Sequence, residues 1–234
     1  MTKRFPIRLF LLALFGALAP GPAQALFGLF EGKPEPKPDS LPYVVEYEPR
    51  DDKTVVQVLK DNSTLERLKD DAPADGESLA RRAEIDAGKL TDALWGEGYY
   101  NGTVEVLVAG RPVRTGEVAA AARAAAAMKG VEVVPISIRA TPGERFTLRN
   151  VAVITPSGAR LDDVPARDLG LSAGDPARAE SVRAAQGRAV DYYRDQSRPL
   201  TKPVDILATV DHARKTMDAT IVVAPGAVAP IGDI

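Results

Sequence analysis

The chain has 234 residues, no cysteine and a single histidine, His212. These absences exclude disulfides, cysteine-based metal clusters and a Cys–His catalytic pair. The chain also has no excess of charge of either sign, because it has 30 basic and 32 acidic residues. Nucleic acids and anionic membrane surfaces attract clusters of Lys and Arg, so the composition favours neither as a partner.

Catalytic motifs are missing as well. The sequence has no Gly-x-Ser-x-Gly elbow, and the glycines of Gly96–Gly102 do not have dinucleotide-binding spacing. The acidic pairs Asp51-Asp52, Asp70-Asp71 and Asp162-Asp163 fall in predicted turns, where solvated surface is the ordinary explanation. We therefore expect no enzymatic activity, cofactor or metal site, and no catalytic residue is assigned.

The amino terminus has the pattern of an export signal. Lys3, Arg4 and Arg8 precede the apolar run Leu9–Ala19, and Ala23-Gln24-Ala25 fits the Ala-x-Ala site of signal peptidase. A retained membrane anchor is the alternative, but a span needs about twenty apolar residues and this run is shorter. We expect residues 1–25 to be a cleaved signal peptide and the mature chain to be exported.

A linker is predicted over residues 26–40. Its second half, Glu31–Ser40, alternates proline with charge, so it cannot bury apolar area and favours an extended, flexible spacer. The folded part is expected to begin near Leu41.

The folded part contains two units with the same order of elements. Both are predicted to run strand, helix, helix, strand, strand, with β-branched runs for strands and 3.6-residue periodicity for helices. The first unit is predicted to contain a strand at 43–47, a short helix from a Ser63-x-x-Glu66 capping box to about residue 70, a helix at 77–95, and strands at 103–108 and 131–138. The second is predicted to contain a strand at 151–154, a turn-rich stretch, a helix at 177–195, and strands at 204–210 and 218–223.

An alanine-rich insertion distinguishes the first unit. Residues 116–130 begin and end with glycine and contain a run of alanine broken only by Arg123, so they predict an extra helix. A helix this short is marginal alone in water, and we expect it to cover its own unit.

A Pro-Gly junction occurs twice. Thr141–Val151 and Ala224–Ile234 both set Pro-Gly ahead of apolar residues that read as a new strand. The second occurrence predicts that residues 226–234 begin a third unit, as in the front part of a longer tandem-repeat protein.

These features resemble a known family. The signal peptide, the tandem units, Gly98-Tyr99-Tyr100, Gly174-Asp175-Pro176 and Val210–Asp218 leading into Ala224-Pro225-Gly226 are similar to the POTRA domains of TamA-like proteins in the BamA/TamA outer-membrane assembly family. The resemblance covers about residues 41–234. The sequence departs from the family pattern at Ser197-Arg198-Pro199, where the family commonly has Gly-Tyr-Pro. The resemblance implies an α+β fold of tandem β-α-α-β-β domains at 41–146 and 147–225, each a three-stranded mixed sheet covered on one face by two helices.

The resemblance also implies a role. It implies a periplasmic scaffold of an outer-membrane protein assembly or translocation factor, with unfolded outer-membrane proteins as clients and an inner-membrane-anchored periplasmic protein as a further partner. Membrane contact would come only through a carboxy-terminal barrel outside this sequence. A stand-alone periplasmic adaptor or chaperone built from such domains is the alternative.

Binding is expected at sheet edges, because the unpaired backbone groups of an edge strand can accept an extended segment. In POTRA domains the strand after the two helices is the usual one, which here gives two segments, 103–108 and 204–210. A merely solvated edge is the alternative, with Glu105 and Asp205 as protective charges. The candidate partner-binding residues are Thr103, Val104, Val106, Val108, Val204, Ile206, Ala208 and Val210.

Aromatic residues offer a second candidate surface, three of them at the junction after the first long helix and two in the middle of the second. We expect them to fill local cores rather than form a recognition patch, because each ring is costly to leave in water. The residues concerned are Trp95, Tyr99, Tyr100, Tyr192 and Tyr193.

Overall fold

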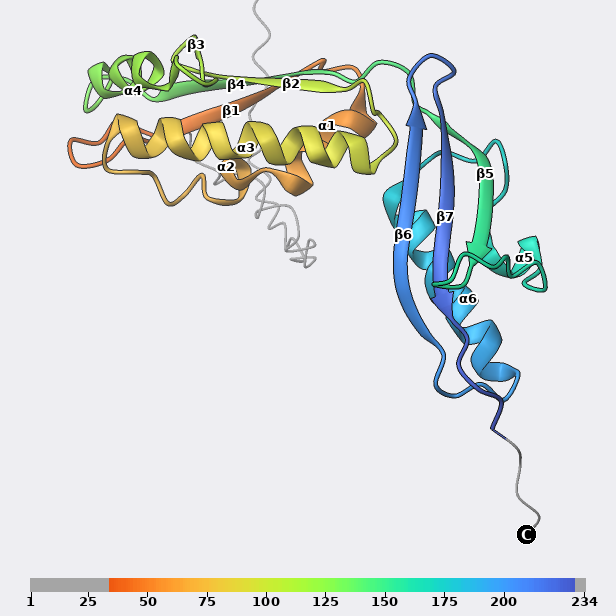
Figure 1. Cartoon of the computed structure of the whole chain (residues 1–234). Coiled ribbons are helices and arrows are strands. Elements are labelled where there is room, and N and C mark those ends of the chain that lie inside the picture. The colour runs from red at the N-terminus through yellow and green to blue at the C-terminus, as the bar shows by residue number, and fades with distance from the viewer. Residues whose placement is uncertain (1–33, 230–234) are drawn as a thin grey trace, which may run out of the picture. The chain divides into compact units, whose positions relative to one another are not determined.

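The computed structural model describes residues 34–229, which form two small sheets, each with its own helices and hydrophobic core (Figure 1). The predicted signal peptide, the linker up to Lys33 and residues 230–234 of the predicted third unit lie outside the described residues. Residues 34–40 contain no helix or strand, and all but Ser40 are exposed.

The first sheet is mixed and has the strand order β1-β4-β2-β3. β1 (Tyr43–Glu48) runs parallel to β4 (Val134–Thr141), and β2 (Thr103–Val108) runs antiparallel to β4. The fourth strand, β3 (Arg111–Pro112), pairs with the end of β2 and was not predicted, so this sheet has four strands instead of three.

A tight hairpin explains the extra strand. Ala109 and Gly110, between β2 and β3, have φ angles of 49° and 73°. Positive φ at both central residues is the geometry that matches the twist of paired strands, but alanine rarely adopts it. The sequence therefore contained no clear signal for this turn.

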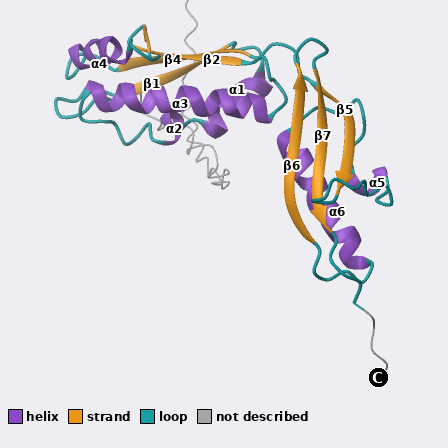
Figure 2. Ribbon diagram, viewed as in Figure 1, coloured by secondary structure: helices purple, strands orange, loops and turns teal. Residues whose placement is uncertain are grey.

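Three helices follow β1 in the chain. α1 (Lys53–Asn62) was missed by the sequence analysis, although Asp52 caps it by accepting from Val55 N at 3.0 Å. α2 (Thr64–Arg67) ends at Arg67 and is shorter than predicted, and α3 (Gly76–Gly96) matches the predicted long helix. In Figure 2 the helices α1 to α3 lie along the sheet of β1, β2 and β4.

Only half of the predicted capping box forms. The Ser63 hydroxyl accepts from Glu66 N at 3.1 Å, as expected. The reciprocal bond is replaced, because Ser63 N donates to Lys60 O and the Glu66 carboxylate accepts from the Tyr47 hydroxyl. Tertiary contacts thus supply the partners that the local motif would have used.

The alanine-rich helix is confirmed as α4 (Val118–Ala127), and it packs against α3 and buries Ala121 and Ala125. The two helices approach closely, since a Cβ added at Gly76 would lie 2.0 Å from Ala122 O. The expectation that this helix covers its own unit is met.

The second sheet has the order β5-β7-β6. β5 (Thr147–Ile154) is parallel to β7 (Thr216–Ala224), which is antiparallel to β6 (Lys202–Asp211). The short α5 (Ala166–Leu169), which was not predicted, and the long α6 (Ala179–Asp195) complete the order β-α-α-β-β that the resemblance implied. The expected α+β class with small mixed sheets is confirmed.

Candidate functional site

The second sheet has an open edge at β6. Most of its residues are exposed, and the side chains of Val204 and Leu207 are 50% and 52% exposed, which is unusual for apolar residues in a strand. Leu207 pairs with Thr220 and Ile206 with the buried Ile221, so successive side chains alternate between the outer face and the core.

Three residues of β6 have backbone N–H and C=O groups that a partner strand could bind. The Ile206 N–H donates to the Asp205 carboxylate at 2.8 Å, which places this amide on the side of β6 away from β7. In an antiparallel ladder the direction of the backbone groups alternates along the strand. The N–H and C=O groups of Ile206, Ala208 and Val210, three of the predicted site residues, therefore point to the free side.

The amino-terminal end of β6 is protected against pairing. Pro203 has no N–H to donate, and the register shifts between Pro203 and Asp205, so Val204 lies in a bulge. The stretch of β6 that remains open for strand addition is therefore 206–211.

The corresponding edge in the first sheet is largely occupied. Val113 N donates to Val106 O at 3.0 Å, and Val108 pairs with Arg111 of β3. β3 and the residue after it cover the end of β2 that contains Val106 and Val108. Of the four predicted residues, only Thr103 and Val104 lie outside this covered part. The side chains of Val106 and Val108 are buried in the core, and that of Thr103 is exposed.

The two remaining edges are partly covered. Val134 N donates to Pro42 O, so in the parallel ladder the backbone groups of Tyr43, Val45 and Tyr47 turn away from β4. Tyr43 and Tyr47 are only 2% and 6% exposed, and Val45 is half-buried. In the second sheet, Leu148 of β5 exchanges backbone hydrogen bonds with the loop at 174–175. Further along β5, Leu161 N donates to Val153 O. Among the described edges, β6 is the longest strand and has the most exposed residues.

Charged side chains order the turn at the far end of β6. The Asp211 carboxylate accepts from the backbone N–H groups of Ala213 and Arg214 at 3.1 and 3.0 Å, and these bonds, Arg214 first, lower the Asp211 pKa. Arg149 Nε donates to Asp218 at 2.9 Å and lowers the pKa of that carboxyl. Asp211 therefore holds the β6–β7 turn in place, and the Arg149–Asp218 pair links β5 to β7.

The aromatic residues do not behave as one group. Trp95 was expected in the core but is 44% exposed, and its Nε1 donates to the carbonyl of the buried Gly102 at 3.1 Å. Tyr99 is half-buried under Arg145, and Tyr100 packs against the second core instead of the first. Tyr193 is buried as expected.

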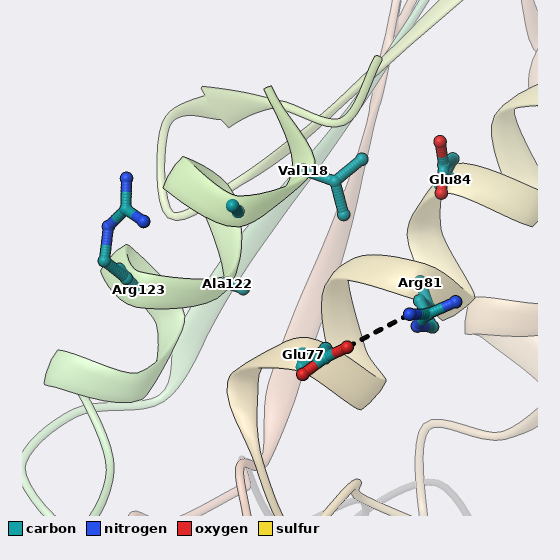
Figure 3. A pocket seen from close by; sticks show the side chains of 7 residues that line it. Glu77, Arg81, Glu84, Val118, Ala122 and Arg123 are labelled. Atoms are coloured by element: carbon teal, nitrogen blue, oxygen red, sulfur yellow. Dashed lines mark hydrogen bonds and ion pairs between the residues drawn. The ribbon is translucent and has the colours of Figure 1, made fainter. Parts of the chain in front are cut away.

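A shallow groove of about 570 Å³ lies between α3 and α4 (Figure 3). Charged side chains rim it, and Glu77 and Arg81 form an ion pair of 3.1 Å within it. The lining residues are Glu77, Arg81, Glu84, Val118, Ala119, Ala122 and Arg123. No residue of β2 or β6 contributes to it.

Residues 34–229 contain neither a metal-binding cluster nor a helix suited to crossing a membrane. Within this range no group of three or more His, Asp or Glu side chains could hold a metal ion. None of the helices described there is long and apolar enough to cross a membrane.

Comparison with known proteins gives likenesses in structure only. No protein-family model matches the sequence, and no curated protein matches it. BamA POTRA3-5 from Haemophilus influenzae is similar with a TM-score of 0.39 and 14% identity, over 81% of this chain and 67% of that one. POTRA1-2 of the periplasmic domain of Omp85 from Anabaena gives 0.39 and 12%, over 85% of this chain and all of that one. The N-terminal domain of Omp85 from Thermosynechococcus elongatus gives 0.30 and 12%, over 80% of this chain and 67% of that one.

Proposed function

We propose that this chain is a periplasmic scaffold in an outer-membrane protein assembly factor, and that it holds extended client segments along β6. The observation that carries the proposal is the accessible edge at 206–211, with three residues whose backbone groups face away from β7. The sequence resemblance to POTRA domains supplies the cellular role, and the predicted signal peptide supplies the compartment.

Strand addition suits such a role because backbone hydrogen bonds are common to all sequences. A client strand would extend the β5-β7-β6 sheet by one, and every second client side chain would meet the outer face at Leu207. An unfolded outer-membrane protein has segments of about ten residues that alternate apolar and polar side chains, which fit a surface of this kind.

The domain boundaries belong to the same proposal. We place one domain at 41–146 and the next at 147–225, with a third beginning within 226–234. The turn at the end of the second domain supports this, because Ala229 N donates to Ser197 O at 2.7 Å, just as Phe146 N donates to Gly98 O at 2.8 Å.

A single substitution in β6 tests the proposal. Ala208→Pro removes an outward N–H but leaves the ladder to β7 intact, since proline is tolerated on the free side of an edge strand. The probe is a fluorescein-labelled peptide of about ten alternating apolar and polar residues ending in phenylalanine, measured by anisotropy with the full chain. We expect Ala208→Pro to weaken binding and the matched control Ala208→Ser to leave it unchanged.

The edge of the first sheet provides the opposing test. Val104→Pro removes an outward N–H from β2 in the same way, and we expect no effect on the peptide. Loss of binding in Val104→Pro with full binding in Ala208→Pro would show that β2, and not β6, receives the client.

A further inference from the structure

Glu97 joins the two folded parts of the chain. It follows α3 directly, and its carboxylate accepts from Arg145 Nη2 at 3.0 Å and from Arg178 Nη2 at 2.9 Å. Arg145 Nε also donates to the Glu97 carbonyl at 2.9 Å. Arg145 precedes β5 and Arg178 is the N-cap of α6, so the carboxylate links the end of α3 to two other segments of the chain.

Apolar contacts surround this charged centre. The Tyr100 hydroxyl donates to Ala177 O at 3.0 Å, and its ring meets Phe146 edge-on with centroids 5.5 Å apart. Phe146 is fully buried, and its N–H donates to Gly98 O. The loop after α3 is thus attached to the second core by packing and by backbone bonds.

The β6–β7 turn makes a separate contact with the same loop. His212 Nδ1 lies 2.7 Å from Asn101 Oδ1, and the His212 ring meets Phe146 with centroids 5.7 Å apart. The strand end nearest this turn is therefore linked to the loop that follows α3.

The second Pro-Gly junction serves as an internal comparison. Aligning the two junctions places Gln196 at the position of Glu97 and Val228 at that of Arg145, while the backbone bond to the turn is kept. The turn therefore folds without a carboxylate. The backbone geometry that the two junctions share therefore does not need the charge of Glu97, which must have another role.

We propose that Glu97 is a clasp that fixes the first sheet and its helices to the second sheet and its helices, so that they move as one body. Charge-assisted bonds to two guanidinium groups are stronger than exposed ion pairs, and the Glu97 side chain is only 21% exposed. Without the carboxylate the two arginines would face each other unpaired. Their side chains are 31% and 41% exposed, so they would lose the one charge that holds them together and could turn toward water. The clasp does not depend on the proposed client binding.

Distance measurement between spin labels tests the clasp. The chain has no cysteine, so labels can be introduced at Thr54→Cys and Ala184→Cys, both exposed and one in each part. The full chain should give one narrow distance distribution. Glu97→Gln, which keeps the side-chain shape, should broaden it, and Arg178→Gln, which leaves α3 untouched, should do the same.

Two controls separate the clasp from general loosening. Glu77→Gln removes an exposed ion pair on the same helix and should leave the distribution narrow. A label pair at Thr54→Cys and Ala126→Cys, both around the first sheet, should stay narrow in every variant. A distribution that is already broad in the unsubstituted chain, or that stays narrow in both Glu97→Gln and Arg178→Gln, would overturn the proposal.

Discussion

Asp86 is a buried carboxylate whose removal should destabilise the first core. It lies on α3 with no exposed surface, and it accepts from the Ser63 hydroxyl at 2.7 Å, Thr64 N at 2.7 Å and Leu65 N at 3.1 Å. Two of these donors are the first N–H groups of α2, which have no partner within the helix. Asp86 therefore caps α2 from another helix.

The cost of removing Asp86 follows from these three bonds. A buried donor left without a partner costs about 1–3 kcal/mol. Asp86→Ala removes the acceptor from three donors, and some of them will regain water through the space left behind, so we expect a loss of about 3–5 kcal/mol. Asp86→Asn keeps one acceptor oxygen but turns an NH₂ toward the remaining donors, and we expect about 2–3 kcal/mol.

Urea unfolding measures this loss directly. The single tryptophan, Trp95, is also on α3, so its fluorescence reports unfolding around the first sheet. Asp92→Ala, an exposed position on the same helix, is the matched control and should change the free energy of unfolding by no more than about 0.5 kcal/mol. A loss below about 1 kcal/mol for Asp86→Ala would refute the view that this carboxylate holds α2 in place.

Two further predictions concern packing and pH. Gly76→Ala should destabilise the α3–α4 contact, because its Cβ would meet Ala122 O at 2.0 Å, whereas Gly88→Ala, with open space around it, should be neutral or slightly stabilising; thermal unfolding compares them. Burial, with the hydrogen bond to Asp163, raises the pKa of Tyr193. The protonated Tyr193 side chain therefore contributes its full stabilisation below the unfolded-state pKa near 10, and this stabilisation is lost as the pH rises above 10 toward the folded-state pKa. Tyr193→Phe should lower stability by about 1 kcal/mol at neutral pH and make the alkaline decline less steep; an unchanged decline would count against this assignment.

Much of the fold was predictable because its signals are local. β2 was predicted with its observed bounds, α3 within one residue at each end and α4 within three, since alternation, helical periodicity and flanking glycines act within a few residues. α1 was missed although its signals were present: Asp52 stands at the cap position, and Val55 and Leu59 form a buried stripe.

The state of the sheet edges depended on contacts that no local pattern records. Both β2 and β6 follow a long helix and look alike as sequences. β2 is covered because Ala109 adopts a left-handed conformation that turns the chain back as β3, and β5 is covered by loops that return from later in the chain. Only the folded chain shows that β6 differs from these two strands.

The sequence by itself determined the long helices, most of the strands, the duplication of the unit and the position of each Pro-Gly junction, because neighbouring residues impose them. Tertiary structure alone decided which edge is open, which residues fill each core and where Glu97 and Asp86 find their partners. Glu97 binds arginines 48 and 81 positions away, and Asp86 caps a helix more than twenty residues earlier. Contacts over such separations form only when packing brings distant segments together, so no pattern within a segment encodes them.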